Sequence, residues 1–117
     1  MDEMDKSQIE QINNVKKIKA IIKRPDEKYG HMTNISNTLE NLQRTVEGYI
    51  EVFRDWRWPF LIICNEEGKI AGHEYNMTLD GEDLVGTIVV VGEDGDEFSD
   101  CPITFQQWKN IVDFQEP

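Results

Sequence analysis

The segment of residues 60–72 constrains the fold of this chain more than any other. It reads Phe-Leu-Ile-Ile-Cys-Asn-Glu-Glu-Gly-Lys-Ile-Ala-Gly. An apolar run enters a polar Asn-Glu-Glu-Gly corner and leaves as a second, shorter apolar run, and Gly68 can supply a positive φ at the corner. This pattern predicts a β-hairpin with strands over residues 60–64 and 69–71.

Three further segments have the alternation or the β-branched content of strands, namely residues 15–24, 49–53 and 84–91. The last of these is the most apolar and is expected to be central, with Gly86 marking a bulge. The stretches between them are expected to be a polar loop at 26–34, an irregular segment at 72–83 and an acidic loop at 92–100.

Two helices are predicted from their end signals. Asn37 with Glu40 three residues later indicates a start, and Gly48 indicates the end of that helix. The last helix is expected to begin near Pro102 or Thr104, where Thr104 and Gln107 fit a capping box.

The order β, α, β, β, β, β, α predicts one α+β domain over residues 15–117. We expect a mainly antiparallel sheet of about five strands with two helices packed on one side. Residues 1–14 are an N-terminal appendage, a short helix or disordered. The residues expected to be largely buried are Ile18, Ala20, Ile22, Leu42, Val46, Ile62, Cys64, Val89, Val91 and Trp108.

The formal net charge of -11 in 117 residues disfavours direct binding to DNA or to an anionic membrane, because phosphate contacts need Lys and Arg. The acidic balance fits either a solvated surface or an acidic face that competes with nucleic acid for a basic groove on another protein. No secretory or membrane-spanning segment is recognisable. We therefore expect a cytoplasmic protein with both cysteines reduced.

Four segments resemble one family. They read Lys-Ala-Ile-Ile from Lys19, Asn-Thr-Leu-Glu-Asn-Leu-Gln from Asn37 with Gly-Tyr-Ile-Glu from Gly48, Cys-Asn-Glu-Glu-Gly-Lys from Cys64, and Val-Gly-Thr-Ile-Val-Val-Val-Gly from Val85. Together they resemble the family catalogued as domain of unknown function 3846, over most of the chain from Val15 to about Asp113. The resemblance implies a phage or mobile-element protein acting in a bacterial host, and it carries over no catalytic residues. One departure is the stretch from His73, where the family tends to have Leu-Pro-Pro-Asn.

The residues most suggestive of recognition are two tryptophans between two predicted strands. Trp56 and Trp58 alternate with Arg54 and Arg57, a mixture that suits a protein-interface hot spot or a nucleobase with its phosphates. At least one indole is expected to be exposed and to belong to a binding surface. Plain packing of both indoles is the alternative.

Other constellations are weaker. Asn65, Glu66 and Glu67 could form an acid–base site, although the same residues suit a turn. The cysteines and histidines lack short-range metal-ligand spacing, so no metal or other cofactor is expected. Neither thiol has the electropositive setting of a nucleophile.

Three hypotheses for function remain open. The first is a small non-enzymatic binding protein that acts on host machinery through an acidic surface, for instance as an inhibitor of a bacterial defence system. The second is a nucleotide-binding sponge that holds a small phosphorylated signal between the tryptophans and the basic stretch of residues 16–24, with Lys19 and Lys23 as contacts. The third is an enzyme that uses residues 65–67. The sequence leaves the oligomeric state open, and a homo-oligomer is compatible with it.

Overall fold

The computed structural model describes residues 16–115, and the predicted appendage at 1–14 lies outside the described residues. Its main sheet has the strand order β2–β1–β7–β4–β3, and every neighbouring pair is antiparallel. The bounds are β1 Lys17–Lys23, β2 His31–Ser36, β3 Ile50–Arg54, β4 Leu61–Asn65 and β7 Ile88–Asp94. A sixth strand, β8 Glu97–Ser99, pairs with the far end of β7.

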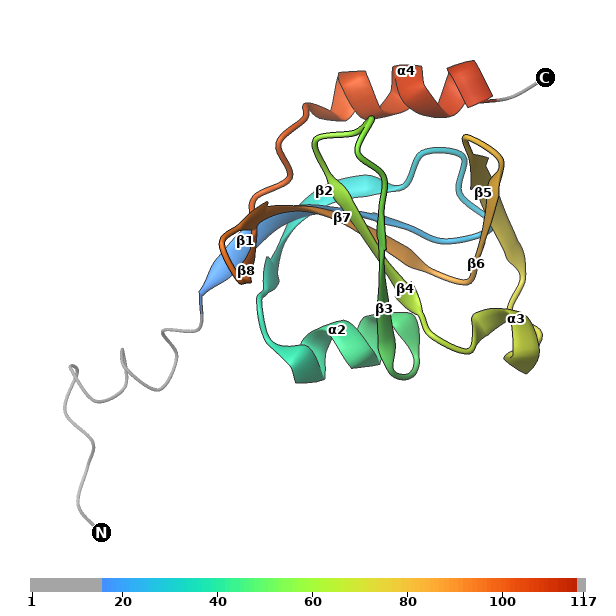
Figure 1. The fold of residues 1–117 in the computed structure, drawn as a ribbon, viewed down its shortest axis with the longest axis horizontal. Helices are drawn as coiled ribbons and strands as arrows, with labels where there is room; N and C mark the ends of the chain where they lie inside the picture. Colours follow the sequence, from blue (N-terminus) through green and yellow to red (C-terminus); the bar gives the residue numbers. More distant parts are fainter. Residues whose placement is uncertain (1–15, 116–117) are drawn as a thin grey trace, which may run out of the picture.

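Three helices and a second, two-stranded sheet complete the described chain (Figure 1). The helices are α2 Leu39–Val46, α3 Gly68–Ala71 and α4 Phe105–Gln115. The small sheet pairs β5 Tyr75–Leu79 with β6 Glu82–Val85. The prediction of a mainly antiparallel α+β fold is therefore confirmed.

The expectation that both helices pack on one side is not confirmed. Leu42 and Val46 of α2 belong to one hydrophobic cluster, and Trp108 and Val112 of α4 belong to another. Figure 1 shows α4 on one side of the main sheet and α2 on the other. The physical reason is that the central strands are apolar on both faces, so each face requires its own cover.

Strand β1 illustrates this double-sided burial. Ile18 and Ala20 face the α2 cluster, whereas Ile21 is fully buried in the α4 cluster. Of the ten residues expected to be buried, eight are, and Ile22 and Cys64 are only half-buried. The residues expected to be buried on β1 omitted Ile21, because they were drawn from a single face of the strand and this strand buries apolar side chains on both faces.

The predicted capping box of α4 is confirmed, whereas the predicted ends of α2 are each shifted by one residue. Thr104 and Gln107 form a reciprocal capping box, in which Gln107 N donates to Thr104 Oγ1 at 3.1 Å and Thr104 N donates to Gln107 Oε1 at 2.8 Å. The N-cap of α2 is Thr38 rather than Asn37, and it accepts a hydrogen bond from Asn41 N. The helix ends before Gly48, with Glu47 in the left-handed conformation.

Five predictions of local structure were wrong. Residues 69–71 belong to helix α3 instead of a hairpin strand, the stretch 26–34 includes most of β2, and the stretch 72–83 contains β5. The predicted strand 84–91 is two strands in different sheets, because Gly86 has a φ of 71° and turns the chain between β6 and β7. The acidic stretch 92–100 is a hairpin between the end of β7 and β8.

Candidate functional site

The loop between β3 and β4 places its two tryptophans in opposite environments. Trp58 is half-buried, and its ring stacks on that of Phe60 at 5.6 Å between centroids. Phe60 in turn meets Trp108 of α4 edge to face at 5.8 Å. Trp56, two residues earlier, is 91% exposed. Exposure of at least one indole is thus confirmed, and its part in binding stays a prediction.

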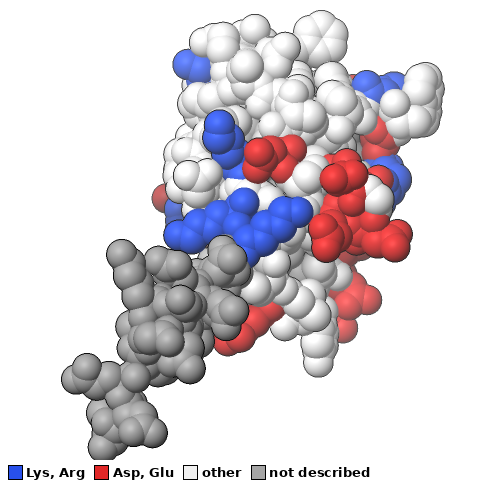
Figure 2. All heavy atoms as spheres, turned by 90° about the vertical axis from the view of Figure 1, so that its left-hand side faces the viewer, with Lys and Arg blue, Asp and Glu red and all other residues white. Residues whose placement is uncertain are grey.

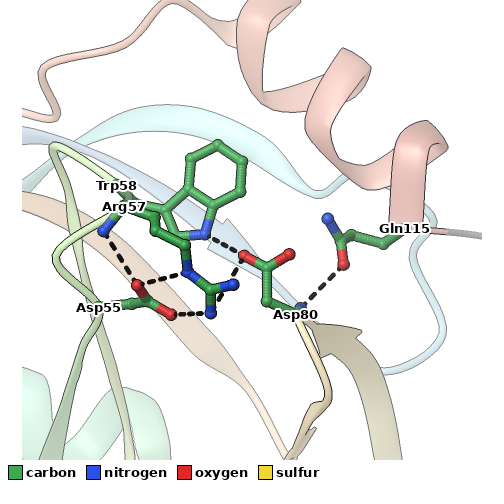
Figure 3. Close-up of polar contacts among 5 residues, drawn as sticks. All are labelled: Asp55, Arg57, Trp58, Asp80 and Gln115. Carbon is green, nitrogen blue, oxygen red and sulfur yellow. Dashed lines mark hydrogen bonds and ion pairs between the residues drawn. The ribbon is translucent and has the colours of Figure 1, made fainter.

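A polar network holds the buried side of this loop (Figure 3). Trp58 Nε1 donates to Asp80 Oδ2 at 2.6 Å, and Asp80 N donates to Gln115 Oε1 of α4 at 2.9 Å. Asp80 lies in the turn between β5 and β6 with a φ of 49°. The network therefore ties three segments that are distant in sequence, and it identifies Trp58 as an anchor of the fold.

Arg54, at the end of β3, and Arg57, in the loop, are both paired with carboxylates. Arg57 donates through N, Nε and Nη2 to Asp55, and these bonds lower the pKa of Asp55 from 3.8 to about 2. Arg54 forms a two-pronged pair with Glu93 of β7, at 2.6 and 2.7 Å, which lowers the pKa of Glu93. These pairs do not form the open platform of indole and guanidinium that a nucleobase needs.

The basic residues proposed for phosphate contact lie on β1, apart from the tryptophan loop. Lys23 is only 2% exposed and donates from Nζ to Asn76 Oδ1 of β5 at 2.6 Å. It lines a groove of about 490 Å³ with Tyr75 and Asn76 that none of the tryptophans lines. The side chain of Lys19 is exposed, and its backbone N donates to Asp100 Oδ1 at 2.8 Å.

Basic and acidic side chains lie next to each other at the end of the molecule that carries β8. Figure 2 shows a cluster of Lys and Arg beside a cluster of Asp and Glu on this face. Lys16 Nζ lies 3.3 Å from Glu97 Oε2. The acidic hairpin is therefore partly compensated by the protein's own bases.

Asn65 has a structural role that the sequence alone left unexplained. Its Nδ2 donates to the carbonyl oxygens of Val46 and Glu47 at 3.0 and 3.1 Å, and its Oδ1 accepts from Glu67 N at 2.8 Å. The side chain thus caps the last turn of α2, where carbonyls lack helical partners. A Cβ on Gly48 would come within 2.6 Å of Asn65 Nδ2, so a larger residue there would displace this amide from its carbonyl partners.

The same segment forms one wall of a groove of about 320 Å³. The groove is lined by β3 and β4 on one side and by α3 and β6 on the other, and its apolar floor includes Phe53, Leu84 and Val85. Its rim carries one lysine, Lys69, and five carboxylates. These carboxylates are Glu51, Glu66, Glu67, Glu82 and Asp83.

The acidic residues of the rim differ in how they are compensated. Glu82 lies 3.7 Å from Lys69 Nζ, and Asp83 Oδ1 accepts from Thr78 Oγ1 at 2.7 Å. Within residues 16–115, no ion pair involves Glu51, Glu66 or Glu67. The groove is consequently a site of uncompensated negative charge over apolar surface.

The pKa of the Cys64 thiol is affected by the acidic residues of the groove. Its Sγ donates to Glu51 O at 3.7 Å, and burial, followed by the charges of Glu51 and Glu82, raises its pKa to about 11. Burial also raises the pKa of Cys101. Both thiols are therefore poor nucleophiles near neutral pH.

The sequence predicted only part of this groove. It singled out Asn65, Glu66 and Glu67, but it missed Glu51 on β3 and the acidic pair that begins β6. The available signal was a set of acidic residues beside three separate apolar segments, and nothing in the sequence indicates that these segments converge. Among the described residues, no three His, Cys, Asp or Glu side chains are grouped so that they could hold a metal ion.

The comparisons identify a family. A family model described as Domain of unknown function (DUF3846) matches residues 18–113. The chain belongs to this family. Neither the curated proteins nor the solved structures include a match to the chain. Within residues 16–115, no helix combines the length and the apolar character needed to cross a bilayer.

Proposed function

We propose that this DUF3846 protein is a non-catalytic binding protein whose acidic groove, between β3–β4 and α3–β6, engages a basic surface of another protein. The observation that carries the proposal is the groove itself, where five carboxylates and one lysine surround an apolar floor. Removing the apolar surface from contact with water favours association, and the uncompensated carboxylates select a cationic partner.

Two features favour binding over catalysis. The amide of Asn65 is engaged through both of its polar atoms with backbone groups, which makes it a structural cap instead of a reactive group. The raised pKa of Cys64 keeps this groove thiol protonated near neutral pH. Neither side chain therefore supplies a reactive group beside the carboxylates of the groove.

The partner class follows from the family resemblance and the charge. A phage- or mobile-element-associated protein acts in a bacterial host, so the proposed partner is a host protein with a basic groove. Proteins of nucleic-acid metabolism and defence have such grooves because they bind phosphate backbones. Inhibition of a defence system by occupation of that groove is the corresponding role, carried out in the host cytoplasm.

The test compares two charge-matched variants in capture experiments from a lysate of the bacterial host. Glu51→Gln/Glu66→Gln removes two negative charges from the groove, and Asp94→Asn/Asp96→Asn removes two from the β7–β8 hairpin, outside the groove. We expect the groove variant to lose its captured protein and the hairpin variant to retain it. Raising NaCl from about 50 mM to about 500 mM should release the partner from the wild-type protein, because salt screens exposed charges.

Equal capture by both variants would show that the groove is not the recognition site. Mass spectrometry of small molecules that co-purify with the protein addresses the nucleotide-sponge alternative directly. A nucleotide recovered with the wild-type protein, together with no protein partner, would replace the proposal by that alternative.

A further inference from the structure

One wall of the groove, β3, is also an edge of the main sheet. The strand order places β3 at one end and β2 at the other, and no strand among residues 16–115 pairs with the outer side of β3. An open edge presents backbone N–H and C=O groups that can pair with another extended chain. The side-chain groove and the open backbone edge therefore lie side by side.

The register determines which groups face outward. Tyr49 and Glu66 lie opposite each other, one step beyond the β3–β4 ladder, and Glu66 N donates to Tyr49 O at 2.8 Å. Antiparallel pairs alternate between hydrogen-bonded and non-hydrogen-bonded positions. By this alternation the N–H and C=O groups of Ile50, Val52 and Arg54 point away from β4, toward the free edge.

Side chains around this edge have the composition of a binding surface. Tyr49, just before β3, is 71% exposed, and Trp56, just after it, is 91% exposed. Ile70 of α3, which lines the groove, is 90% exposed. Large exposed aromatic side chains at the two ends of an open edge strand are typical of interaction sites, since such residues dominate interface energetics.

The two faces of β3 specify what an added strand must carry. Glu51 and Phe53 point into the acidic groove, and Ile50 and Val52 lie on the opposite face, against the α2 cluster. Side chains of an added strand alternate between the same two faces. Residues over the groove would meet negative charge, and the residues between them would meet apolar side chains.

We propose that β3 accepts an extended segment of the partner as an additional strand, with Lys or Arg at alternate positions over the groove and apolar residues between them. This inference rests on the proposed function and names the form of its partner. Backbone hydrogen bonds to the outward groups of β3 provide affinity, and the groove selects the alternating basic side chains.

A second copy of this chain is a poorer occupant of the same edge. Each copy has a formal net charge of -11, so pairing of two β3 strands would bring two acidic grooves together. Like charges that face each other across strands are destabilising. A basic segment removes this repulsion and compensates Glu51 and Glu66.

The experiment uses synthetic peptides of about eight residues, long enough to span the five residues of β3 at roughly 3.3 Å per residue. One peptide alternates Lys and Val, a second has the same composition with the lysines contiguous, and a third carries N-methyl groups on the amides that would pair with β3. We expect the first to bind and the third to bind about tenfold or more weakly, since each lost hydrogen bond reduces affinity by roughly that factor.

Hydrogen exchange locates the interaction. The amides of Ile50, Val52 and Arg54 should become protected when the alternating peptide binds. The other edge provides the control: Asn37 N donates to Lys16 O at 2.8 Å, so the alternation along β2 turns the amides of Met32 and Asn34 outward. These β2 amides should exchange at unchanged rates.

A protein variant complements the peptides. Val52→Pro removes an outward N–H, which is the position where an edge strand tolerates proline. It should weaken peptide binding about tenfold, as expected for one lost hydrogen bond, and circular dichroism checks that the variant is folded. The N-methylated peptide gives the same test on the wild-type protein if Val52→Pro does not fold.

The outcomes separate this inference from the proposed function. Strand addition is wrong if the N-methylated peptide binds as well as the alternating peptide and the β3 amides stay unprotected. The proposed function still stands in that case if capture of the partner depends on Glu51 and Glu66. If neither the peptide nor the partner responds to groove variants, both are wrong. A concentration-dependent dimer in sedimentation that Val52→Pro abolishes would assign the edge to a second copy and overturn the inference.

Discussion

Strand β4 and the residue before it connect a fully buried region of this protein with the solvent-exposed acidic groove, and both lie on a single face of the sheet. Phe60 and Ile62 are buried under α4, at 2% and 0% exposure, whereas Cys64 on the same face is only half-buried and lines the groove. At the buried end an aromatic series from Trp58 through Phe60 to Trp108 fills the space. At the open end the neighbouring side chains are carboxylates.

The difference shows how the same sheet provides both stability and a binding surface. Helix α4 covers only part of the face, and the β5–β6 hairpin covers the next part. Beyond them no described element covers the pair Glu51 and Cys64, so the charged side chains there remain hydrated. Changes at the buried end should therefore affect unfolding, and changes at the open end should affect recognition.

The largest expected effect is at the buried end. Trp108→Ala should lower the free energy of unfolding by about 3–5 kcal/mol, because it removes a fully buried indole and its hydrogen bond to Tyr29 O. Urea denaturation measures the change. Phe114→Ala on the same helix is the control, since Phe114 is 82% exposed and its loss should change stability by less than about 0.5 kcal/mol. Similar effects of the two variants would contradict the described packing of α4.

The two tryptophans of the β3–β4 loop should also differ, one affecting stability and the other affecting partner binding. Trp58→Ala should cost about 2–3 kcal/mol, since it removes the stack on Phe60 and leaves Asp80 without its indole donor. Trp56→Ala should stay within about 0.5 kcal/mol of the wild type and weaken partner binding instead. Thermal unfolding and the capture experiment measure the two properties. A destabilised Trp56→Ala variant would place both indoles in the core.

A variant of Asn65 tests whether this residue of the groove wall stabilises the fold. Asn65→Ala should lower the free energy of unfolding by about 1–3 kcal/mol, because it leaves two carbonyls at the end of α2 and the amide of Glu67 without their partner. Glu66→Gln, one residue later, keeps the fold stable and serves as the control. Full stability of Asn65→Ala would return this residue to the list of candidate functional groups.

A smaller effect is expected in the dependence of stability on pH. Because Arg57 lowers the pKa of Asp55 from 3.8 to about 2, the ionised carboxylate stabilises the folded state above about pH 4. That contribution is lost as the pH falls from about 4 to about 2. In Asp55→Asn and in Arg57→Gln, the midpoint of urea denaturation should depend less on pH across this range than it does in the wild type. An unchanged profile in either variant would show that the pair does not form in solution.

The smallest effect concerns the thiol in the groove. In a Cys101→Ser background, alkylation of Cys64 should be slow near neutral pH and should accelerate toward its pKa of about 11. Burial is the largest cause of the raised pKa of the thiol, and the charges of Glu51 and Glu82 add to it. Glu51→Gln and Glu82→Gln should therefore shift the pH dependence of alkylation to lower pH. Lys69→Gln should shift it the other way. Rapid alkylation at neutral pH would contradict the acidic, half-buried setting.

Much of the fold was predictable because local sequence patterns determine the individual strands and helices. The strands 15–24, 49–53 and 60–64, both helices and the Thr104–Gln107 capping box were read from alternation and end signals. Helix α3 was wrongly predicted as a hairpin strand at 69–71, because a polar corner followed by a short apolar run suits a strand and a helical turn equally. Of the site residues, Asn65 and Trp58 were noticed without their roles, since both roles depend on hydrogen-bond partners 18 to 22 residues away in the sequence.

The sequence by itself determined that this is an acidic, mainly antiparallel α+β chain, because charge, alternation and capping are local properties. Only the tertiary structure decided that α2 and α4 cover opposite faces, that Trp58 is an anchor and Trp56 is exposed, and that Glu51, Glu66 and Glu82 meet around one groove. These features depend on which faces are brought together when strands distant in sequence pair. The strand order β2–β1–β7–β4–β3, which decides this, is a property of the whole sheet.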